Sequence, residues 1–306
     1  MLTFILTAVA TASVTWMLDR WRRSLKAKKT RMHASANEDA TNEEGEWDYG
    51  PLEALLKDLA APAIRFEPQP VREEEMALGR TRIGGQPDLP SQRSWPLTRS
   101  GKPMSFLAQF DLGKMNEVMP NSPLPSSGSL SFFALLEDEL PADGALESAV
   151  LFTPPTDDLK RKKFPSALAE DDRFGSCSLG GGLVRTYPEQ RHEEVTARME
   201  VDEDMLSDFW SDMNMGTHLL GYVNMIQGPP EYEAELAFRF RTTGRVSLRS
   251  EEEAKAIEGW CLLFQLDSEE EAGMMWGDAG YLYFMIREED LQHHRFENVI
   301  CIFQCS

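Results

Sequence analysis

The chain has 306 residues, of which 42% are hydrophobic and 27% are charged, and its formal net charge is −20. This length suits one large globular domain or two tightly joined ones. Residues 1–31 carry seven basic side chains and one acidic, a balance of +6, so the remainder carries 24 basic and 50 acidic side chains, a balance of −26. A body this acidic repels phosphate backbones, which argues against nucleic-acid binding.

The N-terminal segment has the pattern of a membrane anchor. Residues 2–18 contain no charge and as a helix reach roughly 26 Å, close to the ~30 Å hydrocarbon core. All seven basic residues follow this apolar run, the reverse of a secretory signal. We therefore predict a transmembrane anchor over residues 1–19 in the inner membrane, single-pass, with the C-terminal domain in the cytoplasm. A peripheral helix, or an apolar start that never inserts, is the alternative.

Residues 20–50 are predicted to be a basic juxtamembrane segment followed by a flexible acidic linker, because the stretch after residue 31 has almost no aliphatic side chains. Folding is expected to begin near Pro51 with an amphipathic helix. Residues 201–214 are predicted to form a second helix with Asp202 as its N-cap, and the Ser250–Glu253 capping box to start a third. Residues 154–182 mix proline, basic residues and glycine, and are expected to be an extended surface connection.

A strand pattern near residue 109 recurs about 156 residues later. Phe106-Leu-Ala-Gln-Phe-Asp111 is echoed by Leu262-Leu-Phe-Gln-Leu-Asp267, and each copy is followed by a glycine and an aromatic strand. Matching alternation of apolar and polar residues builds matching sheets. We therefore predict an α+β fold for residues 51–306, with two structurally related, mostly antiparallel, β-rich halves (roughly 51–155 and 195–306) and peripheral helices, preceded by the transmembrane helix.

Several of these segments together resemble the YwqG-like family of bacterial proteins over roughly residues 60–306. The segments are Ile83–Pro90, Trp95-Pro96, Phe106–Leu112, Gly128–Phe133, Leu219–Tyr222, Ile226–Gly228, Leu262–Ser268, Trp276–Gly280 and Gln304-Cys305. The resemblance implies an α+β fold rich in antiparallel strands and offers no established active site, because the family is a domain of unknown function. Some members lie near polymorphic toxin genes, which implies a toxin-immunity role. The N-terminal anchor and acidic linker depart from the usual family pattern.

Motifs of common enzyme classes are missing from the sequence. There is no Gly-X-Ser-X-Gly elbow, zinc helix, phosphate loop or dinucleotide fingerprint. Cys301 and Cys305 would lie about 13 Å apart on a strand, at ~3.3 Å per residue, which is too far for one disulfide or one metal. We therefore expect no cofactor, no metal and no catalytic residue, and four reduced thiols.

The repeated polar positions are the candidate site residues. Gln109 and Gln265 project from equivalent strands, and the structural interpretation is that they satisfy backbone groups where the halves join. The functional interpretation is a cleft for a polar ligand at that junction. His218, beside a glycine segment, is the candidate imidazole, although a hydrogen-bonded structural histidine is the alternative. The predicted ligand-binding set is Trp95, Gln109, His218, Gln265, Trp276 and Asp278.

Two functions of different classes follow. The first is a noncatalytic, membrane-anchored binding protein whose acidic surface meets a basic protein partner, in the manner of a toxin-immunity protein. The second is a small-ligand-binding or hydrolytic domain with its site at the junction of the halves. The absence of catalytic motifs favours the first.

Overall fold

The computed structural model describes residues 49, 52–53, 56–136, 144–156, 158–189, 203–213, 215–244, 251, 255 and 258–305. Its contacts divide the chain into two units, Met1–Asp58 with Arg191–Met213, and Leu59–Gln190 with Asn214–Ser306. Of the predicted linker only Tyr49 is described, and the Asp202 cap and the two capping-box residues Ser250 and Glu253 lie outside the described residues.

The predicted transmembrane helix, and the inner-membrane location that rested on it, need correction. No helix in the part of the chain that the structure describes is long and apolar enough to cross a bilayer. The longest described helix, α6 (Pro230–Thr243), has 14 residues and therefore spans only about 21 Å, and it carries several charges. Residues 2–18 themselves lie outside the described residues.

The smaller unit contains helix α5 (Glu203–Asp212), which confirms the helix predicted over residues 201–214. Its apolar stripe is buried, and the ring of Phe209 packs edge-on against that of Tyr49 with centroids 5.4 Å apart. The Tyr49 hydroxyl donates to the Asp212 carboxylate at 3.1 Å. Leu52 and Leu56 are also fully buried in this unit, as an amphipathic segment predicts.

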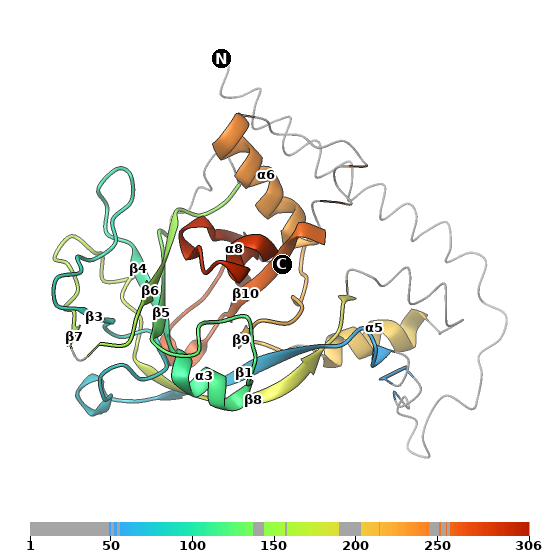
Figure 1. Ribbon diagram of the computed structural model, residues 1–306, viewed down its shortest axis with the longest axis horizontal. Coiled ribbons are helices and arrows are strands. Elements are labelled where there is room, and N and C mark those ends of the chain that lie inside the picture. Colours follow the sequence, from blue (N-terminus) through green and yellow to red (C-terminus); the bar gives the residue numbers. More distant parts are fainter. Residues whose placement is uncertain are drawn as a thin grey trace. The chain divides into compact units, whose positions relative to one another are not determined.

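The larger unit is built on one ten-stranded sheet in which every pairing is antiparallel (Figure 1). Its spatial order is β12 (Ile300–Gln304), β11 (Tyr281–Arg287), β10 (Trp260–Asp267), β9 (His218–Leu219), β1 (Ala61–Pro70), β8 (Cys177–Thr186), β2 (Arg82–Ile83), β4 (Ser105–Asp111), β5 (Ser129–Ala134) and β6 (Ser148–Thr153). β3 (Asp88–Pro90) and β7 (Leu159–Arg161) form a small second sheet. The α-helices described in this unit are α3 (Leu112–Val118), α6 and α8 (Glu288–Gln292), and its short 3-10 helices are η1 (Glu73–Glu75), η3 (Glu270–Ala272) and η4 (Phe296–Asn298).

The predicted α+β class is therefore corrected to a mainly antiparallel β domain with few helices. Both repeats contribute strands to one continuous sheet, since β1 pairs with β9 and β8 pairs with β2. The backbone N–H of Leu146, just before β6, donates to the carbonyl of Cys301 in β12 at 2.9 Å, so the two ends of the sheet meet. The expected surface connection over residues 154–182 contains β7 and most of the long strand β8.

The sheet nevertheless has the internal duplication that the sequence predicts. Outward from the central pair β1 and β8, the strands run β9, β10, β11, β12 on one side and β2, β4, β5, β6 on the other. The two repeated sequence segments are β10 and β4, which occupy matching places in this order. Both strands also have a register shift at the same point, between Leu262 and Phe264 and between Phe106 and Ala108.

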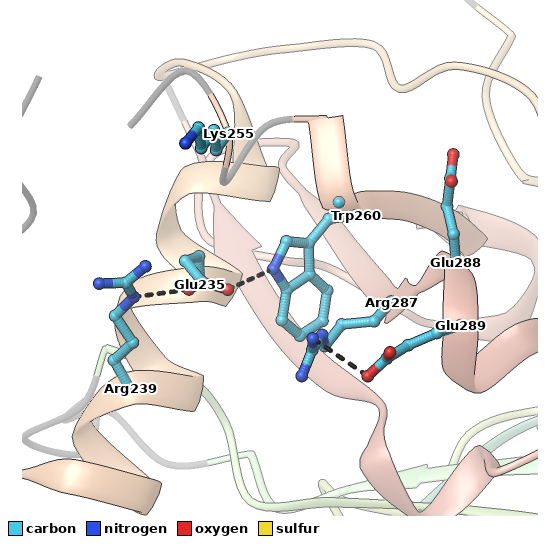
Figure 2. Close-up of a pocket in the computed structure, with 8 residues that line it drawn as sticks. Glu235, Arg239, Lys255, Trp260, Arg287, Glu288 and Glu289 are labelled. Carbon is cyan, nitrogen blue, oxygen red and sulfur yellow. Dashed lines mark hydrogen bonds and ion pairs between the residues drawn. The ribbon is translucent and has the colours of Figure 1, made fainter. Parts of the chain in front are cut away.

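Different elements pack on the outer faces of the two ends of the sheet. Helix α6 packs on β10, β11 and β12, where Trp260 donates its indole N–H to Glu235 of the helix at 2.8 Å (Figure 2). On the other end, the outer cluster comprises Leu89, Met104, Phe106 and Phe133, with Trp95 packed against it. The same strand framework is thus covered by a helix in one half and by loops and a small sheet in the other.

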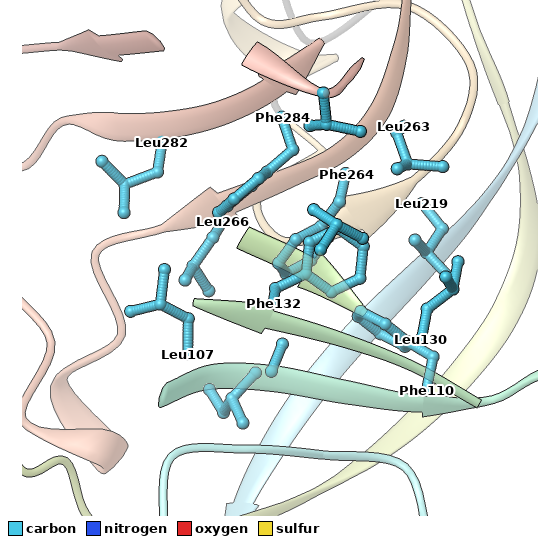
Figure 3. Close-up of a cluster of buried hydrophobic side chains, with 14 of the residues drawn as sticks. Leu107, Phe110, Leu130, Phe132, Leu219, Leu263, Phe264, Leu266, Leu282 and Phe284 are labelled. Carbon is cyan, nitrogen blue, oxygen red and sulfur yellow. The ribbon is translucent and has the colours of Figure 1, made fainter. Parts of the chain in front are cut away.

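The inner faces of the two ends share one apolar core (Figure 3). Phe110 and Phe132 from the first half contact Phe264 from the second with ring centroids 4.9 Å apart, and Phe132 contacts Phe284 at 5.0 Å. All four rings are fully buried. The place where the halves join is therefore aromatic, and the polar residues of the same strands point away from it.

Candidate functional site

The two predicted glutamines occupy equivalent, fully buried positions on the outer faces of their strands. The side-chain oxygen of Gln109 accepts a hydrogen bond from the backbone N–H of Asp88 at 2.9 Å, and that of Gln265 accepts one from Asn224, also at 2.9 Å. Each glutamine therefore satisfies a backbone group, as the structural interpretation predicts. It does so within its own half, however, and away from the place where the halves join.

The loops that these glutamines hold are also equivalent. Thr81-Arg-Ile-Gly-Gly-Gln-Pro-Asp88 and Thr217-His-Leu-Leu-Gly-Tyr-Val-Asn224 share the spacing of their threonine, glycine and final Asp or Asn. The Thr81 and Thr217 hydroxyls accept from the backbone N–H groups of Asp111 (3.0 Å) and Asp267 (3.1 Å). Thr81, Thr217, Asp88 and Asn224 were not identified from the sequence as equivalent residues. Their common spacing in the two loops is the signal by which they could have been recognised.

Both loops turn through left-handed backbone at the same two positions. The φ angles are 59° and 66° at Gly84 and Gly85, and 61° and 75° at Leu220 and Gly221. A side chain on Gly221 would place its Cβ 2.8 Å from that of Ala63, which explains the glycine there. The loops thus leave the sheet by the same path in each half.

His218 lies beside Gln265 in the sheet register and is fully buried. Its Nδ1 is 2.9 Å from the carbonyl oxygen of Gly216 and its Nε2 is 3.0 Å from that of Tyr222. Burial lowers the pKa of His218, against the opposing effect of these two carbonyls. Both ring nitrogens face backbone carbonyl oxygens, and the neutral ring donates its one N–H to one of them, so His218 helps to hold its own loop.

The other three predicted residues lie elsewhere. Trp95 donates its indole N–H to the Met104 carbonyl at 2.8 Å and covers the outer face of the first half. Trp276 and Asp278 lie on the loop after β10, where Trp276 is buried and Asp278 is exposed. The structure therefore brings His218 together with Gln265, whereas Trp276 and Asp278 share only a loop. Ligand binding by this set stays a prediction.

The loop of residues 267–280, here named the acidic loop, is held rigidly by its own hydrogen bonds. The Ser268 hydroxyl accepts from the Trp276 backbone N–H at 2.9 Å and donates to the Gly280 carbonyl at 3.1 Å. The Trp276 indole donates to the Asp267 carbonyl at 2.9 Å. Met275, next to this anchor, is 60% exposed. The acidic loop therefore presents a large apolar side chain on a fixed support.

The carboxylates of Asp267, Glu269 and Glu271 in the acidic loop have no basic partner among the described residues. Burial raises the pKa of Glu269 to about 7, the Thr217 hydroxyl opposes this, and the charges of Asp267 and Glu271 add to it. Burial also raises the pKa of Asp267. Among the described residues no Lys, Arg or His forms an ion pair with any of these three acids. Their repulsion is thus uncompensated within the described chain.

A polar groove lies at the outer face of the second half, between α6 and the start of α8 (Figure 2). Its volume is about 320 Å³, and its lining residues are Glu235, Arg239, Lys255, Gly259, Trp260, Arg287, Glu288 and Glu289.

Several charges of this groove are already paired. Arg239 pairs with Glu235 at 2.6 Å and Arg287 with Glu289 at 3.0 Å. Within the described residues, the exposed Lys255 and Glu288 form no ion pair. Two opposite charges therefore remain available at the groove.

A second group of acids is buried at the N-terminus of α6. Glu231 is 4% exposed, and its Oε2 has no hydrogen-bond partner among the described residues. Burial raises the pKa of Glu231 to about 7. Burial likewise raises the pKa of Glu233 to about 7, although the Gln304 amide, which donates to it at 2.9 Å, opposes the shift. Both carboxyl groups favour the protonated form in the folded protein.

Burial sets the chemistry of the cysteine thiols. All four cysteines are free thiols, and burial raises the pKa of Cys177 to about 11 and of Cys261 to about 12, so these thiols stay protonated at neutral pH. Over the described ranges, no group of three His, Cys, Asp or Glu residues is placed to hold a metal ion.

Comparison with protein families finds that residues 81–305 match a domain of unknown function, DUF1963. The matched region includes both glutamine-held loops, the acidic loop and the groove. A search of curated proteins finds no match.

The buried acids predict a pH-dependent stability. The folded-state pKa values near 7 lie above the ordinary value of 4.5, so the free energy of unfolding should fall as pH rises from about 4.5 to about 7 and stay low above that. Replacing Glu231 by glutamine should therefore stabilise the protein by about 1–3 kcal/mol at pH 8 and much less at pH 5. Urea denaturation at both pH values measures this. The exposed control Glu297→Gln should change little at either pH, and an equal effect of Glu231→Gln at both would contradict the prediction.

Proposed function

The chain belongs to the DUF1963 family, a domain family of unknown function, and from that premise we propose that it is a noncatalytic binding module for a basic protein partner. Within the family we propose a YwqG-like member, because the segments from Ile83 to Cys305 follow that pattern in order. The proposal assigns the contact surface to the acidic loop. A toxin with a cationic active site is one partner of this chemistry, which makes toxin immunity the specific form of the proposal.

The observation that carries the proposal is the rigid acidic loop itself. It offers exposed Met275 together with three carboxylates, of Asp267, Glu269 and Glu271, that pair with no basic residue in the described chain. A lysine or arginine from a partner would stabilise the ionised form of Glu269, whose pKa is raised to about 7. Because the loop is already held by Ser268 and Trp276, little ordering entropy opposes binding.

The net charge of the chain acts in the same direction. The balance of −26 outside residues 1–31 attracts a basic partner at long range, which speeds encounter and disfavours acidic competitors. Met275 then supplies apolar contact at short range. His218 is fully buried with its two ring nitrogens facing backbone carbonyls of its own loop, so its contacts are those of a residue that holds the loop.

A cationic probe tests this surface. Binding of a fluorescent octalysine peptide to the full chain should weaken steeply as salt rises from 50 to 200 mM. The triple change Asp267→Asn, Glu269→Gln and Glu271→Gln should weaken binding roughly tenfold, measured by fluorescence anisotropy. The matched control changes exposed acids elsewhere, Glu67, Glu74 and Glu297, to glutamine and alters the net charge equally. Equal weakening by both triples would show that overall charge binds the peptide, and would contradict a site at the acidic loop.

A second candidate function, binding of a small zwitterion, is favoured by the groove beside α6. Its volume of about 320 Å³ lies within the range of small-molecule pockets. Lys255 and Glu288 supply opposite charges without ion-pair partners in the described residues, and Trp260 lies between them in the view of Figure 2. An α-amino acid carries the complementary carboxylate and ammonium.

Calorimetry with free amino acids tests this second candidate. Lys255→Gln and Glu288→Gln should each weaken binding roughly fivefold, because each removes one charge contact worth about 1 kcal/mol. The exposed Lys163→Gln, away from the groove, is the control for lost positive charge. Absence of binding by every common amino acid, or equal weakening by the control, would reject the groove as a zwitterion site.

A further inference from the structure

Three buried polar side chains form a row across the outer face of the first half. Arg82 of β2 is directly opposite Gln109 of β4, and Gln109 is directly opposite Ser131 of β5. Directly opposed residues of an antiparallel pair project from the same face with Cβ atoms about 5 Å apart. All three side chains are 0% exposed. The row therefore concentrates guanidinium, amide and hydroxyl donors in a part of the molecule that bulk solvent does not reach.

Each member of this row has a polar atom without a partner. Arg82 Nη1, Gln109 Nε2 and Ser131 Oγ are all buried and make no hydrogen bond with the described residues. Leaving one such group unsatisfied costs about 1–3 kcal/mol. Three adjacent instances are unusual, because buried polar atoms are nearly always paired.

The equivalent row in the second half is satisfied by the chain. It comprises His218, Gln265 and Tyr283, which have the same cross-strand register. Gln265 Nε2 donates to the carbonyl of Gly216 at 2.9 Å and to the side-chain oxygen of Asn224 at 3.2 Å. The Tyr283 hydroxyl donates to the Asn224 carbonyl at 2.6 Å. In the second half, the chain itself therefore supplies the hydrogen-bond acceptors for the row.

Two substitutions between the halves contribute to the difference. Asp88 occupies the place of Asn224, but its carboxylate is engaged by Arg161 of β7, with Nε at 2.9 Å and Nη2 at 3.1 Å. The Asp88 carboxylate thus faces Arg161 and accepts no hydrogen bond from Gln109 Nε2. Ser131 occupies the place of Tyr283, and its short side chain does not extend to the loop as the phenol does. The first row consequently lacks counterparts of the two contacts to Asn224, and Gln109 Nε2 also lacks a counterpart of the contact that Gln265 Nε2 makes with the Gly216 carbonyl.

We propose that the Arg82–Gln109–Ser131 row is an internal binding site for a small molecule with acceptor oxygen atoms. The guanidinium and amide N–H groups and the serine hydroxyl donate to it, and the molecule replaces the acceptors that the second half supplies from its own chain. The shared chemistry fits either water or a small carboxylate such as formate.

The surrounding charges favour a neutral occupant. Arg82 pairs with Glu73 at 2.7 Å and Arg161 with Asp88 at 2.9 Å, so the two cations are balanced by two carboxylates. A further buried anion would add uncompensated charge, which is costly in a desolvated site. Water is therefore the expected occupant, and a carboxylate is the alternative that the experiment distinguishes.

The direction in which Ser131→Ala changes the melting temperature tests the proposal. If Ser131 donates to a bound acceptor, Ser131→Ala in the full chain should lower the melting temperature by about 2–4 °C. If the hydroxyl is an unpaired group, its removal should leave the melting temperature unchanged or raise it, and either result would overturn the proposal. Tyr283→Phe, which deletes the paired hydroxyl of the second row, calibrates the loss of one such bond.

A second variant separates hydrogen bonding from packing. Ser131→Cys nearly keeps the side-chain volume but donates weakly, so it should lower the melting temperature as Ser131→Ala does. A lower melting temperature in Ser131→Ala but not in Ser131→Cys would assign the effect to packing and overturn the proposal.

Sodium formate, compared with sodium chloride at equal ionic strength, identifies the occupant. A rise in melting temperature that Ser131→Ala abolishes indicates a carboxylate, and the absence of a rise, together with loss in both serine variants, indicates water.

Discussion

The hydrogen bond from a loop N–H to a buried glutamine oxygen is the constraint on which the two halves depend. Gln109 holds Asp88 and Gln265 holds Asn224, both at 2.9 Å. Each bond fixes a loop that leaves the sheet through left-handed backbone and crosses its outer face. Because the glutamines point outward, the inner faces stay free of polar groups and their phenylalanines make one common core. Side chains along β4 and β10 alternate between the two faces of the sheet. Their polar side chains therefore make hydrogen bonds on the outer face, and their phenylalanines pack on the inner face.

Duplication explains the strand framework that the two halves share. The halves differ in the elements that pack on the outer face of that framework. In the first half, Arg82 of the polar row pairs with Glu73 while Asp88 of the loop pairs with Arg161, whereas in the second half Gln265 and Tyr283 of the row both bond to Asn224 of the loop. The second half also carries the features on which the proposed binding functions rest, the acidic loop and the groove beside α6. A shared framework of this kind places equivalent residues without giving them equivalent tasks, so function is assigned from each surface separately.

The sequence predicted the repeated strands well because periodicity is a local signal. Phe106–Asp111 lies within β4 and Leu262–Asp267 within β10. The long strand β8 was missed because Gly180–Gly182 has little strand propensity, and its pairing with β1 is a contact between residues distant in the chain. The two-residue strands β2 and β9 are too short to show periodicity. For the candidate site, burial of His218 and the partnership of each glutamine with a loop N–H depend on tertiary contacts, which residue types alone do not specify.

Amide hydrogen exchange tests the equivalence of the two halves most directly. The backbone N–H groups of Asp88 and Asn224 should both exchange slowly, although they lie in or beside loops, because each donates to a buried glutamine. In Gln265→Met the Asn224 amide should exchange much faster while that of Asp88 stays protected, and Gln109→Met should give the reverse. Fast exchange of either amide in the unmodified protein, or protection that survives both substitutions, would contradict the account.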